Sequence, residues 1–276
     1  MSFLRLAMML GILNALFLAV GLFFAGIAGM TIGLLIALAM NVLAYWYSDS
    51  FVLRLYGAKP YENRKLMAVI DKLAKKHGIP KPKLYFVNTD VPNAFATGRS
   101  PKRSAVAVTR GLMDKLDDSE VEAVLAHELS HVKHRDTLVS TMAATLGGAL
   151  TWFAYLFWFG SDERNRNALS YVLLFILAPL AAMLVRLSIT RSREYLADRG
   201  GAGIADPLKL ASALEKISAS VKERPMRGNA AASHLFIVNP FSAGNIAGLF
   251  STHPSTESRV ERLKAMSKEM ANATKK

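Results

Sequence analysis

The chain has 276 residues, 52% of them hydrophobic, and the apolar residues are gathered in long runs. This grouping favours an integral membrane protein over a soluble one. The formal charge of +13 does not indicate nucleic-acid binding, because Lys and Arg are interspersed with Asp and Glu and no aromatic recognition motif accompanies them. The absence of cysteine excludes disulfides and thiolate metal sites, so any bound zinc must be held by His and carboxylates.

Two apolar runs without an acidic residue begin the chain, at residues 3–29 and 31–47. Small residues around Gly26 and Gly29 separate the runs, so the sequence predicts an N-terminal transmembrane hairpin over residues 1–47. A cleaved signal peptide is the competing interpretation, because a positive charge precedes the first run and small residues lie near its end. The second run, which follows at once, favours the hairpin.

The polar segment over residues 48–136 is predicted to be cytoplasmic and to carry the catalytic residues. Residues 63–77 have a helical apolar period that stops at Gly78. Residues 83–87 and 104–108 are short apolar runs typical of strands. Three turn residues lie between these two strands: Pro92, Gly98 and Pro101.

The last part of this segment begins another helix. Ser119 and Glu122 have the spacing of a capping box, so the helix is expected to start near Asp118. The predicted helix runs on through Val121 and Val124, which lie on its apolar side.

A His-Glu-x-x-His motif lies on this predicted helix. His127 and His131 are four residues apart, so their imidazoles share one helix face and can reach a single zinc ion. Glu128 projects one residue round the helix, where it can take a proton from a water molecule on the metal rather than bind the metal itself. A chance match is the alternative, but the cap and the flanking apolar residues favour a catalytic motif, since an unliganded buried Glu would be costly.

A second pair of apolar runs, residues 137–159 and 167–190, follows the motif and is joined by a short polar connection. At about 1.5 Å of rise per residue, each run is long enough to cross roughly 30 Å of hydrocarbon. We therefore expect a second transmembrane hairpin over residues 137–190.

The final polar segment, residues 191–276, is predicted to be cytoplasmic like residues 48–136 and the N-terminus, because Lys and Arg are abundant on that side of both hairpins. Residues 207–222 and 256–271 are predicted to be helical. Residues 223–250 are predicted to form a loop, because they have no clear period and contain several Gly and Pro.

The third zinc ligand does not lie next to the motif. Extended zinc patterns require Gly where this chain has His134 and His where it has Thr137, so His134 is expected to be a surface or supporting residue. The second hairpin returns the chain beside the histidines after about Thr190, where Glu194 and Asp198 lie four residues apart. Glu194 can complete a three-ligand site, and Asp198 can accept the other ring N–H of a ligating histidine. The alternative is that both are solvated charges paired with neighbouring arginines.

Four motifs occur in order around the two hairpins: Val-Pro-Asn-Ala-Phe-Ala-Thr-Gly at 91–98, Ala-His-Glu-Leu-Ser-His at 126–131, Ser-Arg-Glu-Tyr-Leu-Ala-Asp at 192–198, and Thr-His-Pro at 252–254 followed by Arg259. With these motifs the chain resembles the HtpX-type membrane zinc metalloproteases, bacterial relatives of the CAAX prenyl endopeptidases. The resemblance implies an endopeptidase of the bacterial inner membrane that takes part in quality control of membrane proteins from the cytoplasmic side, often under stress.

The resemblance also implies roles for two further residues. The segment around Asn93 would line the substrate cleft as an extended edge, and His253 would assist at the scissile carbonyl. From the residues alone, Asn93 could equally be a turn residue after Pro92, and His253 a surface residue before Pro254. Ser255 stands where the commoner family form has a second proline, which concerns the shape of the loop rather than the histidine.

The expected protein is thus a mainly α membrane protein with two transmembrane hairpins and a cytoplasmic α+β zincin-like metalloprotease domain. It would hold one zinc ion per chain and meet protein substrates at the lipid bilayer, with Glu128 as the base and His253 near the oxyanion. A non-catalytic zinc-binding scaffold or sensor is the main alternative, and it predicts little effect of replacing Glu128. A zinc transporter is disfavoured, because residues 137–159 contain no ionisable group.

Overall fold

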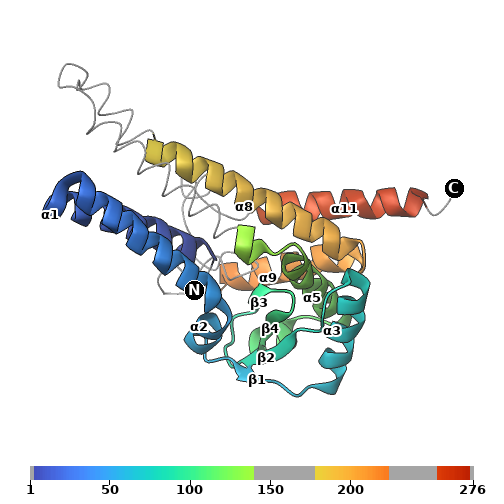
Figure 1. Ribbon diagram of the computed structural model, residues 1–276. Coiled ribbons are helices and arrows are strands. Elements are labelled where there is room, and N and C mark those ends of the chain that lie inside the picture. Colours follow the sequence, from blue (N-terminus) through green and yellow to red (C-terminus); the bar gives the residue numbers. More distant parts are fainter. Residues whose placement is uncertain (1–2, 140–177, 224–253, 274–276) are drawn as a thin grey trace.

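The computed structural model describes residues 3–139, 178–223 and 254–273 (Figure 1). A four-stranded sheet and the helices packed on it surround the metal motif. The strands are β1 (Lys59–Pro60), β2 (Lys83–Val87), β3 (Ala94–Ser100) and β4 (Arg103–Thr109). The helices of the described residues are α1 (Phe3–Trp46), α2 (Ser48–Leu55), α3 (Arg64–His77), α4 (Arg110–Lys115), α5 (Asp118–Lys133), α8 (Ala178–Ala202), α9 (Pro207–Glu223) and α11 (Thr256–Ala273).

The sheet has the strand order β1-β2-β4-β3, with β2 and β4 parallel and the two outer pairs antiparallel. Alternate residues of β4 are buried on opposite faces. Val106 and Val108 join the core formed with α3, α5 and α9, while Ala105 and Ala107 pack with residues of α2. Burial on both faces suits the inner position of this strand. β3 is an edge strand and lies beside α5, the helix that carries the metal motif.

The N-terminus of α5 is capped by Asp117, whereas the sequence analysis predicted Ser119. Oδ1 of Asp117 accepts a hydrogen bond from the Glu120 backbone N–H at 2.8 Å, and the Glu120 carboxylate accepts one from the Asp117 N–H at 2.9 Å. The predicted capping box of Ser119 and Glu122 was wrong. The sequence offers two overlapping capping boxes, and the one that forms is that of Asp117 and Glu120. The predicted start of the helix, near Asp118, is confirmed.

Helices α5 and α8 cross closely because two glycines of α8 lie against α5. A Cβ on Gly201 would lie 2.9 Å from the backbone nitrogen of His127, and a Cβ on Gly200 would lie 2.1 Å from Oγ of Ser130. Both distances are shorter than van der Waals contact. The missing side chains therefore let the C-terminal part of α8 approach the backbone of the motif helix, beside which it lies in Figure 1.

Most elements predicted within the described residues are confirmed. α3 follows Asn63, whose side chain caps the first turn, and ends at Gly78, which is left-handed with φ 69°. β2, β4, α9 and α11 agree with their predicted ranges. The residue patterns did not predict β1 and β3 as strands: Pro60 lies inside β1, and Gly98, which was interpreted as a turn residue, lies inside β3. Gly98 has φ 133°, and the carbonyl of Arg103 occupies the place of a side chain, so this hairpin position requires glycine.

The two predicted transmembrane hairpins are not confirmed. In α1 the backbone leaves helical geometry at Ala25 and Gly26, close to where the sequence analysis placed the turn of the first hairpin. Among the residues that the structure describes, no helix has both the length and the apolar character that a membrane crossing requires. Most of residues 137–190 and nearly all of the predicted loop at 223–250 lie outside the described residues, so the division into four segments stays a prediction.

Candidate active site

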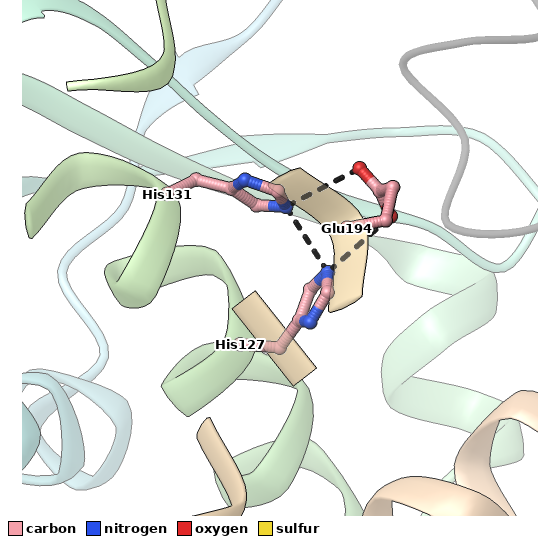
Figure 2. A group of neighbouring side chains, drawn as sticks. All are labelled: His127, His131 and Glu194. Carbon is pink, nitrogen blue, oxygen red and sulfur yellow. Dashed lines mark hydrogen bonds and ion pairs between the residues drawn. The ribbon is translucent and has the colours of Figure 1, made fainter. Parts of the chain in front are cut away.

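Three potential metal ligands meet where α5 and α8 cross. The Nε2 atoms of His127 and His131 lie 3.1 Å apart, and the Glu194 carboxylate lies 3.9 Å from the first and 3.5 Å from the second. Figure 2 shows the two imidazoles of α5 and the carboxylate of α8 pointing toward one another. His127 and Glu194 are buried, and His131 is half-buried. The structure thus brings together the three residues that the sequence analysis proposed as ligands.

The spacing of these atoms suits a zinc ion. Bonds of 2.0–2.1 Å in a tetrahedral arrangement separate neighbouring ligand atoms by about 3.3 Å. The separations of 3.1, 3.5 and 3.9 Å bracket this value. Three protein ligands leave a fourth position open, which is typical of catalytic rather than structural zinc sites.

Each of the two histidines has a carboxylate beside its other ring nitrogen. Nδ1 of His127 lies 3.0 Å from Oδ1 of Asp198, although the pair is not aligned as a straight hydrogen bond. Nδ1 of His131 lies 2.5 Å from Oδ2 of Asp136. Without a bound metal, burial opposes the charged imidazolium of His131, but the bond to Asp136 and the nearby charge of Glu194 outweigh it and raise the pKa of His131 to about 10. Asp198 therefore lies where the sequence analysis expected it, and Asp136 has an equivalent place on the other ring.

Arg259 of α11 is fully buried beside the ligand group. Its guanidinium donates two hydrogen bonds to Asp198, of 2.9 and 2.7 Å, and lies 3.3 Å from the Glu194 carboxylate. Burial acts to raise the pKa of Asp198, but the positive charge of Arg259 outweighs burial and lowers this pKa to about 2. A buried cation from α11 thus holds and partly neutralises the two buried carboxylates of α8.

Glu128 connects the motif helix to the edge strand. Its Oε2 accepts a hydrogen bond from the backbone N–H of Ala96 in β3 at 2.8 Å. Burial raises the pKa of Glu128, while the neighbouring His127 and His131 act in the opposite direction. A carboxyl group with a raised pKa is suited to accept and release a proton near neutral pH.

The other residues that the sequence singled out are placed differently. Asn93 directly precedes β3 and is 1% exposed; its N–H donates to Oγ1 of Thr109, and its carbonyl accepts from the same hydroxyl. The side chain of Asn93 is therefore buried, and its contact with a substrate stays a prediction. His134 follows the end of α5 and lies 3.3 Å from Oγ of Ser130, outside the ligand group. His253 lies outside the described residues.

Comparison with known proteins decides the family. The model of peptidase family M48 matches residues 60–267. The chain belongs to peptidase family M48. Its predicted resemblance to the HtpX-type proteases is confirmed as well: this M48 metalloprotease is 50% identical to the Protease HtpX homolog of Pyrococcus abyssi over 96% of each chain. It is 48% identical to the Protease HtpX homolog of Salinibacter ruber over 96% of this chain and 98% of the relative.

A solved structure shares the fold of the M48 peptidase. The crystal structure of S. mikatae Ste24p matches with a TM-score of 0.53 and 20% identity, over 83% of this chain and 57% of that chain. At this identity the match shows a common fold and carries no further inference. Family membership favours an enzyme over the zinc-binding scaffold and the transporter that the sequence alone left as alternatives.

Sequence reasoning missed several residues of the site. Asp136 received no role, because it follows the end of α5 and does not share the helical spacing of the motif. Arg259 was noted only as part of a motif, since one arginine in a basic chain carries no signal of burial. Gly200 and Gly201 could have been found, because two consecutive glycines shortly after Glu194 and Asp198 can indicate a close approach of another backbone.

Proposed function

We propose that the protein is a zinc endopeptidase in which His127, His131 and Glu194 hold one zinc ion per chain. The supporting observation is the group of two imidazoles, whose Nε2 atoms lie 3.1 Å apart, and a carboxylate, with Glu128 adjacent to His127 on the same helix. When bound, zinc would polarise the scissile carbonyl and lower the pKa of a water molecule.

Glu128 is the proposed general base. Because burial raises its pKa, a proton that it takes from the attacking water can be passed on to the leaving amine. The hydrogen bond from the Ala96 N–H, at 2.8 Å, orients the Glu128 carboxylate. His253 is proposed to donate a hydrogen bond to the oxyanion that forms at the scissile carbonyl.

The open edge of β3 is the proposed substrate site. β3 pairs with β4 on one side only, and on the other side its Ala96 N–H meets Glu128. An extended peptide can add to such an edge through main-chain hydrogen bonds, which would bring its carbonyl groups beside Glu128. Asn93 would position the beginning of this edge through its backbone bonds to Thr109. Because main-chain recognition depends little on side chains, we expect broad tolerance of substrate sequence.

We further propose that the enzyme acts at the bacterial inner membrane, on the cytoplasmic side, and cleaves misfolded or damaged membrane proteins under stress. The exposed surface of α1 supports contact with lipid, because it carries large apolar side chains such as Phe23 (83% exposed), Leu35 (61%) and Val42 (61%). The abundance of Lys and Arg in the two polar segments supports their cytoplasmic orientation. The expected partners are therefore protein substrates and the lipid bilayer, and no nucleic acid.

A comparison of membrane proteins in cells with active and inactive enzyme tests this function. Membrane proteins of cells that produce the wild type or Glu128→Ala are compared by mass spectrometry, and we expect uncut substrates to accumulate with the variant. His134→Ala is the control, because it changes a histidine outside the ligand group, and cells that produce it should resemble the wild type. If Glu128→Ala and His134→Ala give the same membrane protein composition, the quality-control function is wrong.

A further inference from the structure

We infer that Asp136 positions the ligand His131, and that Arg193 holds Asp136 in place. The inference rests on the proposed zinc function. Oδ2 of Asp136 lies 2.5 Å from Nδ1 of His131, and Oδ1 accepts a hydrogen bond from Nε of Arg193 at 2.6 Å. Since each carboxylate oxygen has a different partner, the two contacts together fix the orientation of the carboxylate.

Arg193 contacts this part of the chain through more than one atom. A terminal guanidinium nitrogen also bonds to Oδ1 of Asp136, and the same nitrogen donates to the backbone carbonyl of His134 at 2.7 Å. Such a forked contact restrains direction as well as distance. The next residue on α8 is Glu194, so this helix supplies both a proposed ligand and the group that restrains the partner of another ligand.

A left-handed turn directly before Asp136 brings its carboxylate to His131. Arg135 has φ 54°, and among the described residues it is the one non-glycine residue with a positive φ. This left-handed conformation costs roughly 1–2 kcal/mol for a residue with a Cβ, and such strain persists where the surrounding structure imposes it. The turn at Arg135 ends α5 and brings Asp136 back onto His131, five positions earlier in the chain.

A carboxylate beside Nδ1 of His131 determines which ring nitrogen carries the hydrogen. With Nδ1 of His131 directed at Asp136, the ring carries its hydrogen on that side and presents Nε2 to His127 and Glu194. His127 has Asp198 in the corresponding position, at 3.0 Å. Each of the two histidine ligands thus has its own carboxylate, one from α8 and one from the turn after α5.

The contact also joins two elements that are far apart in the sequence. Asp136 and Arg193 lie 57 positions apart, one just after the end of α5 and the other within α8. A displacement of either element would therefore change the orientation of His131 directly. The pair thus acts on the site through His131, and its role is to position this ligand.

Zinc affinity tests this assignment. Wild type, Asp136→Asn, Arg193→Ala and the double variant are purified as full chains in detergent, freed of metal and titrated with zinc against a competing chelator. Asp136→Asn should lower the affinity about 10–100-fold. Arg193→Ala should lower the zinc affinity less, because the carboxylate of Asp136 remains. The double variant should have the same affinity as Asp136→Asn, because Arg193 acts through Asp136. Asp71→Asn removes a carboxylate from an ion pair with Lys75 on α3 and should bind zinc like the wild type.

Two further measurements distinguish the positioning of His131 from a general loss of structure. Cobalt(II) bound in place of zinc should show a changed visible spectrum in Asp136→Asn, because the spectrum reports the geometry of the ligands. Arg193→Lys, which keeps a donor for Asp136, should recover part of the affinity lost in Arg193→Ala. Wild-type affinity in Asp136→Asn overturns the inference, and if that variant does not fold, wild-type affinity in Arg193→Ala does so. A wild type that binds no zinc overturns the proposed function instead.

Discussion

Replacing Gly201 by Ala tests whether the close crossing of α5 and α8 sets the geometry of the metal site. The new Cβ would lie 2.9 Å from the backbone nitrogen of His127 and 3.0 Å from its Cα. Non-bonded carbon atoms are most stable about 3.5–4.0 Å apart, so the helices would have to separate by roughly 0.5 Å or more. Metal–ligand distances tolerate a change of only about 0.2 Å. Glu194 and His127 would then no longer reach one ion without strain.

The expected loss of zinc affinity follows from the cost of this overpacking. An extra methyl group in a close-packed contact costs about 1–3 kcal/mol. The metal-free protein can relieve this cost by moving α8 away from α5, whereas the zinc-bound protein cannot. If the whole cost is subtracted from the binding free energy, the affinity of Gly201→Ala falls roughly 5–140-fold, at 1.4 kcal/mol per factor of ten.

Chelator competition on the purified full chain measures this loss, with two related variants for comparison. Gly203→Ala is the matched control, because its Cβ would meet only carbonyl oxygens at 3.4 and 3.6 Å, and it should bind zinc like the wild type. Gly200→Ala collides with the hydroxyl of Ser130, so the second change Ser130→Ala should recover part of the affinity that it loses. Wild-type zinc affinity in Gly201→Ala would show that the close crossing of α5 and α8 does not set the geometry of the metal site.

Three other predictions concern the buried charges and the topology. Arg259→Ala leaves the carboxylates of α8 without their buried cation, so it should lower the free energy of unfolding by about 3–5 kcal/mol in denaturant titrations, and an unchanged value would contradict this. Because the pKa of folded Asp198, about 2, lies below its ordinary value of 3.8, its contribution to stability is present above about pH 4 and is lost as the pH falls toward 2. Between pH 5 and 2, the free energy of unfolding of the zinc-free wild type should therefore fall by about 2 kcal/mol more than that of Asp198→Asn. Equal losses would contradict a lowered pKa of Asp198 beside Arg259. In intact cells, a membrane-impermeant thiol reagent should label a cysteine at position 164 but not one at position 75, and labelling at position 75 would reverse the orientation.

The two histidine ligands were predictable because they follow a local rule: their spacing alone puts them on one helix face. Glu194 and Asp198 were placed beside them by the predicted second hairpin, most of which lies outside the described residues. The boundaries of α3, α9 and α11 followed from apolar period and end signals in the same way. For the histidine pair and for these helix ends, the relevant interactions lie within one or two turns of a helix.

The rest of the site depends on contacts that no local pattern encodes. Arg259 is buried because α11 packs against α8, which is a property of the tertiary structure. Asp136 reaches His131 through a left-handed turn at Arg135, a conformation that the residue type does not favour. β3 was missed because Gly98 indicated a turn, whereas here it permits a close approach within a hairpin.

The most direct test of the account is the Glu128→Ala enzyme, assayed for bound zinc and for cleavage of an unfolded protein such as casein. Glu128 is placed to move a proton and is not among the three ligands, so the variant should keep about one zinc ion per chain. Proton transfer by a positioned group contributes typically 10²–10⁴-fold, and the cleavage rate should fall by at least about this factor. A Glu128→Ala protein that retains its zinc and digests casein at the wild-type rate would contradict the mechanism.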